Sequence, residues 1–128
     1  MKAVSDANVQ SDLIRIVLRF NDALNAGDVD GMMRCMTDDC VFENTDPPPD
    51  GARFEGQAAV RFFWEEFFRS SSQARIATED IFALENRCVM QWRYEWIDPH
   101  GQPGHVRGVD VYRLQDGLIA EKLSYVKG

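Results

Sequence analysis

Several features that would assign a function directly are missing from this sequence. Its three cysteines are an odd number without paired spacing, which disfavours a disulfide framework, and no His, Cys or Asp spacing matches a metal site. No hydrophobic run approaches membrane-spanning length, and the first twelve residues are too polar for a secretory signal. We therefore expect a cytoplasmic protein without a metal site or a membrane span.

Positive charge is scarce as well. The chain has 21 acidic and 14 basic residues, a formal net charge of −7, and no cluster of Lys and Arg. A nucleic-acid partner is excluded because its site would need a basic surface. There is no Gly-rich phosphate loop and no Gly-x-Ser-x-Gly motif, so we predict neither a cofactor nor a serine nucleophile.

What is present fits a single folded domain spanning residues 1–128, since 45% of the residues are hydrophobic. Apolar residues recur at three- and four-residue intervals over residues 6–26, which predicts an amphipathic helix. Asp28 can cap a second helix over residues 29–36. A third helix, rich in Phe and Trp, is predicted from residue 57 to about 71.

Strand-like patterns dominate the rest of the chain. The predicted strands are 40–44, 53–55, 73–85, 88–98, 105–114 and 118–127. Asp116-Gly117 separates the last two and predicts a type I′ hairpin turn, because both residues tolerate positive φ. Helices followed by consecutive strands predict an α+β fold, in which three N-terminal helices close a cone-shaped, curved antiparallel sheet.

The most unusual residue of these strands is Asp110. Its parity places it on the same strand face as Gly108, Tyr112 and Leu114, and aspartate is depleted in strands. If that face points inward, a carboxyl group is buried, and burial without a cation would raise its pKa by as much as about 3–5 units. We therefore expect Asp110 to be a buried acid or base inside a pocket.

A nearby cation is the competing possibility for Asp110. Arg107, His105 or Lys122 could pair with it and hold it ionised, although Arg107 has the opposite strand parity. For the last strand, the sequence does not decide which residues point inward. Depending on the position of one bulge, they are either Lys122 and Ser124 or Leu123 and Tyr125.

The strand over residues 88–98 has one almost wholly aromatic face, formed by Met90, Trp92, Tyr94 and Trp96. Aromatic residues with polar tips are typical of ligand cavities. The alternative is a bulky core beneath the long helix.

Three segments resemble a known family. The run from Phe20 to Gly31, the run from Thr37 to Asn44, and the strand containing Val109-Asp110 resemble the ketosteroid isomerase and SnoaL-like branch of the nuclear transport factor two-like superfamily. The resemblance implies a cystatin-like α+β roll with an apolar pocket and a homodimer formed through the outer face of the sheet. It does not imply one activity, because this fold hosts many.

Compared with the isomerase, the site is incomplete. Asp110 matches the position of the protonated acid that donates to an oxyanion, a case that is itself a standard example of pKa tuning. The general-base position is Asn44, which cannot accept a proton at neutral pH, and the tyrosine position is Phe20, which has no hydroxyl group. Steroid isomerisation by that mechanism is therefore not expected.

The second comparison is with limonene-epoxide-hydrolase-like enzymes. Phe42-Glu43-Asn44 is similar to their Tyr-x-Asn motif. Trp92, Tyr94 and Ser124 occupy the positions of their water-activating Arg and Asp residues, so that mechanism is not expected either. A single pocket aspartate resembles SnoaL-type cyclases.

We therefore hypothesise a cofactor-independent isomerase, cyclase or hydrolase-type enzyme that acts on a small apolar carbonyl or epoxide compound. Asp110 transfers the proton, and Asn44 and Tyr94 orient the substrate or a water. The predicted substrate-binding residues are Phe20, Phe42, Trp64, Phe68, Trp92, Trp96 and Tyr112. The alternative is a non-catalytic ligand-binding or dimerisation domain with the same fold.

Overall fold

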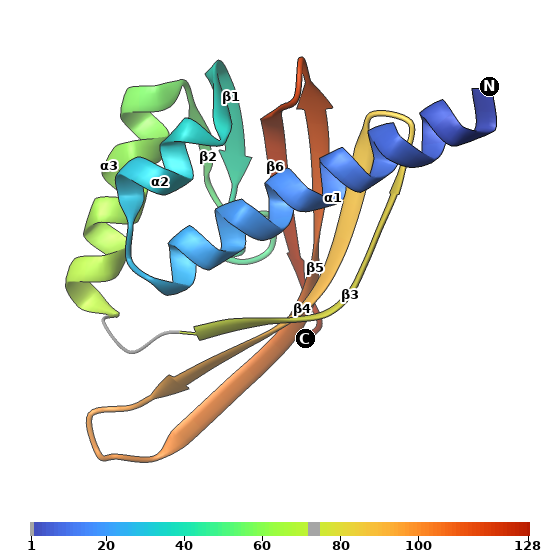
Figure 1. Ribbon diagram of the computed structural model, residues 1–128. Coiled ribbons are helices and arrows are strands. Elements are labelled where there is room, and N and C mark those ends of the chain that lie inside the picture. The colour runs from blue at the N-terminus through green and yellow to red at the C-terminus, as the bar shows by residue number, and fades with distance from the viewer. Residues whose placement is uncertain (1, 72–74) are drawn as a thin grey trace.

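The computed structural model describes residues 2–71 and 75–128. Its elements, coloured along the chain in Figure 1, are α1 (Lys2–Asn25), α2 (Val29–Arg34), β1 (Met36–Glu43), β2 (Arg53–Glu55), α3 (Gln57–Ser70), β3 (Arg75–Leu84), β4 (Arg87–Ile97), β5 (Pro103–Gln115) and β6 (Leu118–Val126). The predicted α+β class is confirmed. Positions 73 and 74 of the strand predicted over residues 73–85 lie outside the described residues.

Helix α1 forms because its apolar residues make one stripe. Leu13, Val17, Phe20 and Leu24 are all buried, and each buried side chain of this kind contributes roughly 1.5–3 kcal/mol. The chain then turns at Gly27, whose φ is +67°. As predicted, Asp28 caps α2: its carboxylate accepts a hydrogen bond from the Gly31 N–H at 2.9 Å.

The six strands form one curved sheet in the order β2-β1-β6-β5-β4-β3 (Figure 1). The sheet is mixed, which corrects the expectation of a wholly antiparallel one, because β1 and β6 pair in parallel. Strand β1 also begins at Met36 instead of Cys40, and the helix before it ends at Arg34, two residues earlier than predicted. Helix α1 crosses β3, β4 and β6, whereas α3 covers β1 and β2.

The hairpin between β5 and β6 determines which residues of β6 face the helices. Its turn residues have φ of +53° at Asp116 and +80° at Gly117, as a type I′ turn requires. The register then changes: Leu114 pairs with Ile119, but Arg113 pairs with Glu121. Ala120 is therefore an extra, unpaired residue, a β-bulge, and it reverses the faces of the residues that follow it.

Two indole rings lie over glycines of the neighbouring strand. Trp92 pairs with Gly108, and a Cβ added to Gly108 would lie 2.6 Å from Trp92 Cζ2. Trp96 packs on Gly104 in the same way. The two glycines thus make room for rings that lie flat against the sheet.

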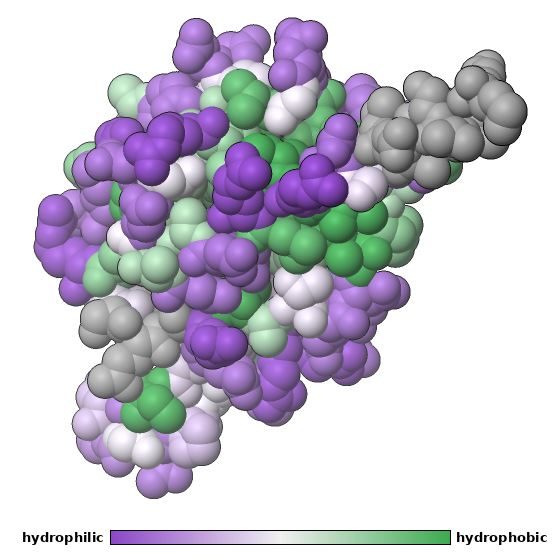
Figure 2. Space-filling model, in the orientation of Figure 1, coloured by the Kyte–Doolittle hydropathy of each residue, from purple (hydrophilic) through white to green (hydrophobic). Residues whose placement is uncertain are grey.

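The visible surface is mainly hydrophilic (Figure 2). Hydrophilic residues dominate the face shown in Figure 2, with hydrophobic residues exposed between them. No helix within the described residues is both long and apolar enough to cross a membrane.

Candidate functional site

A cavity of about 510 Å³ lies between the sheet and α3. Six of the sixteen lining residues are aromatic, two are aliphatic and eight are polar or charged. The lining residues are Phe42, Asn44, Thr45, Asp46, Phe63, Trp64, Glu66, Phe67, Ser70, Ile76, Trp92, Tyr94, Val106, Asp110, Lys122 and Ser124. A cavity of this size and composition suits a small, mostly apolar molecule.

Asp110 lies in the wall of this cavity and is 3% exposed. The alternating burial of β5 places its side chain on the inward face together with Gly108, Tyr112 and Leu114, as the strand parity predicted. One carboxylate oxygen, Oδ2, accepts a hydrogen bond from the Tyr112 hydroxyl at 3.1 Å and lies 3.1 Å from Lys122 Nζ. Asp110 is therefore half of a buried ion pair.

This pairing corrects the expectation that no cation neutralises Asp110. Of the three candidate partners, Arg107 pairs instead with Glu79 and His105 is exposed. Lys122 is 4% exposed, and it lies in the row next to Asp110 because it pairs with Tyr112 across the β5–β6 ladder. The desolvation cost of both charges is offset only while they stay together.

The ammonium group of Lys122 has a second polar neighbour and an aromatic surrounding. It donates a hydrogen bond to Ser124 Oγ at 3.0 Å. Its Nζ lies 4.6 Å from the centroid of the Phe42 ring and 5.6 Å from that of Trp64, distances at which a cation is attracted to a ring face. Lys122 is thus held by one carboxylate, one hydroxyl and two cavity-wall rings.

Sequence reasoning did not single out Lys122 because its inward orientation depends on the bulge at Ala120. A regular two-residue hairpin would place Glu121 opposite Tyr112 and turn Lys122 outward. Composition held a weaker signal, since the chain contains eleven arginines and only three lysines.

Three buried polar atoms have no hydrogen-bond partner in the described part of the chain. They are the carboxylate oxygen Asp110 Oδ1 and the indole nitrogens of Trp64 and Trp92. All three belong to residues that line the cavity. Buried polar groups are almost always satisfied, so three unpaired atoms in residues of one cavity wall are unusual.

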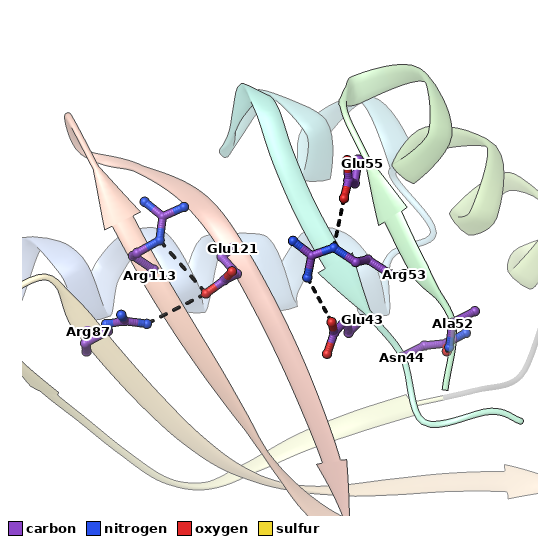
Figure 3. A network of polar contacts seen from close by, with 8 residues as sticks. All are labelled: Glu43, Asn44, Ala52, Arg53, Glu55, Arg87, Arg113 and Glu121. Carbon is purple, nitrogen blue, oxygen red and sulfur yellow. Dashed lines mark hydrogen bonds and ion pairs between the residues drawn. The ribbon is translucent and has the colours of Figure 1, made fainter. Parts of the chain in front are cut away.

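Asn44 lies at the end of β1, in the cavity wall. Its side-chain oxygen accepts a hydrogen bond from the Ala52 N–H at 2.7 Å, and its backbone N–H donates to Ala52 O at 3.1 Å (Figure 3). These two bonds close the loop that contains the three prolines. Asn44 therefore positions this loop against the cavity.

Tyr94 is half-buried and also lines the cavity. Burial raises the pKa of its hydroxyl group, and a hydrogen bond with Ser71 lowers it in part. Tyr112 lies deeper. Burial first, and then the charge of Asp110, raise the pKa of Tyr112 well above its ordinary value, so its hydroxyl keeps its proton and donates to Asp110.

The seven predicted substrate-binding residues divide into two groups. Phe42, Trp64 and Trp92 line the cavity. The other four are not among its lining residues, which corrects their assignment: Phe20, Phe68, Trp96 and Tyr112. Phe20 is fully buried between the rings of Trp64 and Tyr112, so it supports the wall from behind.

Metal and thiol chemistry find little support at this site. Within residues 2–71 and 75–128, no group of three or more His, Cys, Asp or Glu side chains could hold a metal ion. Burial raises the pKa of the Cys88 thiol to about 11, and it also raises the pKa of Cys35 and Cys40. Buried thiols with raised pKa values are poor nucleophiles.

Comparison with known proteins identifies the family. The family model of the SnoaL-like domain matches residues 17–122. An NTF2-like protein of unknown function from Mesorhizobium loti is 35% identical, with 93% of each chain covered and a TM-score of 0.78. This chain belongs to the SnoaL-like family. The resemblance recognised in the sequence is thereby confirmed.

More distant structures share the fold of this SnoaL-like domain. One is described as a SnoaL-like polyketide cyclase from Jannaschia sp. CCS1, with 19% identity, coverage of 92% of this chain and 87% of that chain, and a TM-score of 0.78. Another is described as a ketosteroid isomerase from Kribbella flavida, with 14% identity, coverage of 93% and 80%, and a TM-score of 0.78. The family and its structural neighbours thus include proteins described as cyclases and isomerases.

Proposed function

We propose that this SnoaL-like domain is a cofactor-independent enzyme that moves a proton within a small, mostly apolar carbonyl compound, with Asp110 as the base. One observation carries the proposal. Asp110 is a buried carboxylate in the wall of a cavity with six aromatic lining residues. One of its oxygens is paired to Lys122 and Tyr112, and the other has no donor within residues 2–71 and 75–128.

The pairing gives each carboxylate oxygen a separate role. Lys122 and Tyr112 both donate toward Oδ2 and occupy that oxygen. Oδ1 is then free to accept a proton from the carbon beside a substrate carbonyl. Returning that proton to another carbon completes an isomerisation. Attack of the enolate on a second carbonyl, followed by transfer of the proton from Asp110 to the new alkoxide, completes a cyclisation.

One feature favours a carbonyl compound over an epoxide. Opening of an epoxide by water needs a group of charged residues that activates the water. The resemblance to limonene-epoxide-hydrolase-like enzymes implies that Trp92, Tyr94 and Ser124 stand in place of those residues.

The test is deuterium exchange at the carbon next to the carbonyl of 2-tetralone, followed by proton NMR in heavy water. We expect wild-type protein to accelerate exchange and Asp110→Asn to lose at least about a hundredfold of that acceleration, the usual contribution of a general base. Asp116→Asn is the matched control, since it makes the same chemical change in the exposed turn.

Unchanged exchange in Asp110→Asn would refute the role of Asp110. Tight retention of apolar ketones by the wild-type protein, without exchange of any of them, would favour the alternative of a binding domain. Circular dichroism of each variant confirms that a loss of exchange does not reflect unfolding.

We also propose that two copies of the chain associate through the outer face of the sheet. Four apolar residues in register form a row across that face: Phe82, Val89, Val111 and Leu123. Phe82 is 56% exposed and continues this apolar row, and contiguous exposed apolar surface is typical of protein–protein contacts. Sedimentation should show a dimer at micromolar concentration and a monomer for Val111→Glu; a wild-type monomer would contradict the proposal.

A further inference from the structure

The choice of lysine at position 122 is informative. Arginine is better suited than lysine to a permanent ion pair, because its guanidinium group binds a carboxylate with two parallel hydrogen bonds and stays charged. This chain contains eleven arginines and three lysines, yet the buried pair uses a lysine. Lysine differs in two respects: its amine is compact, and it can lose a proton and act as a nucleophile. The cation of this buried pair is therefore a residue that can act as a nucleophile.

The surroundings of Lys122 are suited to that chemistry. Its amine lies in the cavity wall, where the Phe42 and Trp64 rings limit access of bulk water. Asp110 Oδ2, at 3.1 Å, is placed to take a proton from the ammonium group. Water is a product of the condensation of an amine with a carbonyl, so an apolar cavity also disfavours the reverse reaction.

We propose that Lys122 condenses with apolar aldehydes and ketones to form a protonated imine. The ammonium group first passes a proton to Asp110 Oδ2, and the nitrogen lone pair attacks the carbonyl carbon. The oxygen takes up that proton, and the attacking nitrogen then carries two protons and a positive charge. One of these two protons moves to the hydroxyl group, which leaves as water, and the carbon–nitrogen double bond forms. One carbonyl compound and one ammonium group thus give one iminium group and one water, with no oxidant or reductant.

The charge balance of the cavity is the same before and after this reaction. The ammonium and the iminium group each carry one positive charge, so Asp110 has a counter-ion in the starting state and in the product, and no unpaired charge is left in the buried site. The inference goes beyond the proposed proton transfer, because condensation requires no proton to leave a carbon atom. The two proposals share the substrate class, an apolar carbonyl compound, and the use of Asp110, which acts through Oδ1 in the proton transfer and through Oδ2 in the condensation.

The test uses benzaldehyde with sodium cyanoborohydride, which reduces an imine to a stable benzylamine, followed by proteolysis and mass spectrometry. Exposed Lys127 serves as the internal reference. We expect Lys122 to be benzylated faster than Lys127 in the folded wild-type protein. In Asp110→Asn, which lacks the acceptor for the ammonium proton, the ratio of labelling at Lys122 to labelling at Lys127 should fall, whereas Asp116→Asn should leave it unchanged.

Benzylation of Lys127 without benzylation of Lys122 would overturn the inference, and so would equal labelling ratios in wild type and Asp110→Asn. The 2-tetralone exchange measurement separates the two proposals. Labelling at Lys122 without deuterium exchange would support the imine and refute the proton transfer, whereas exchange without labelling would do the opposite.

Discussion

Two neighbouring residues of β6 form ion pairs on opposite faces of the sheet. Lys122 faces the cavity and pairs with Asp110 at 3.1 Å, and both side chains are 5% exposed. Glu121 faces outward and accepts two longer contacts, 3.7 Å from Arg87 and 3.9 Å from Arg113 (Figure 3). Arg87 and Arg113 are 52% and 33% exposed.

The comparison shows that exposure to solvent, more than the number of partners, decides how much an ion pair contributes to the stability of the fold. On the outer face, water solvates any charge that loses its partner, so the loss costs little. On the inner face, an unpaired charge keeps its full desolvation cost. The inner pair is therefore a constraint on the fold as well as a candidate for chemistry.

The largest effect is expected from breaking the inner pair. Lys122→Met keeps most of the aliphatic stem but removes the ammonium group, which leaves the buried Asp110 carboxylate without its cation. The free energy of unfolding at neutral pH should fall by about 3–5 kcal/mol, measured by urea denaturation.

The control for this variant is the double variant Asp110→Asn/Lys122→Met, which removes both charges. It should recover most of the lost stability, because no unpaired charge remains. A single Lys122→Met variant as stable as the wild-type protein would show that the inner pair does not constrain the fold.

An intermediate effect is expected from the buried thiol on the inner face. The pKa of Cys88 is raised from 9.0 to about 11 in the folded protein. Below pH 9.0 the thiol is protonated in both states, but between 9.0 and about 11 it ionises only in the unfolded chain. Stability is therefore lost as the pH rises through this window.

Cys88→Ala should remove this contribution. Urea denaturation across the alkaline range should show a shallower loss of stability in the variant than in the wild-type protein. Parallel curves would mean that Cys88 ionises equally in the folded and unfolded states.

The smallest effect is expected on the outer face. Arg87→Gln should change the free energy of unfolding by no more than about 1 kcal/mol, because the pair is exposed and Arg113 also contacts Glu121. Added salt should shrink even this difference, since it screens exposed charges. A loss as large as that of Lys122→Met would invalidate the contrast between the two faces.

Much of the fold could be predicted because local patterns specify it. The stripe of α1, the cap at Asp28, the Asp116-Gly117 turn and the inward parity of Asp110 each depend on residues close together in the chain. The parallel pairing of β1 with β6 could not be predicted, because it joins the first strand to the last.

The candidate site was harder to predict than the fold. The inward orientation of Lys122 depends on a bulge that no residue type announces, so the counter-ion of Asp110 stayed one of several alternatives. The aromatic wall was only partly recognised, because strand parity gives the face of a ring but not its depth. Phe20 and Tyr112 share the inner layer with Trp92, yet they lie behind the cavity wall.

The bulge at Ala120 has a consequence for how this pocket can change. If Ala120 were paired in a regular ladder, Glu121 would lie beside Asp110, and two carboxyl groups would have to share a proton. Deleting Ala120 would instead leave a regular ladder with Lys122 still opposite Tyr112. The pairing of Ala120 thus decides the sign of the charge that meets Asp110: Lys122 lies beside Asp110 while Ala120 is bulged or deleted, and Glu121 would lie there if Ala120 joined the ladder.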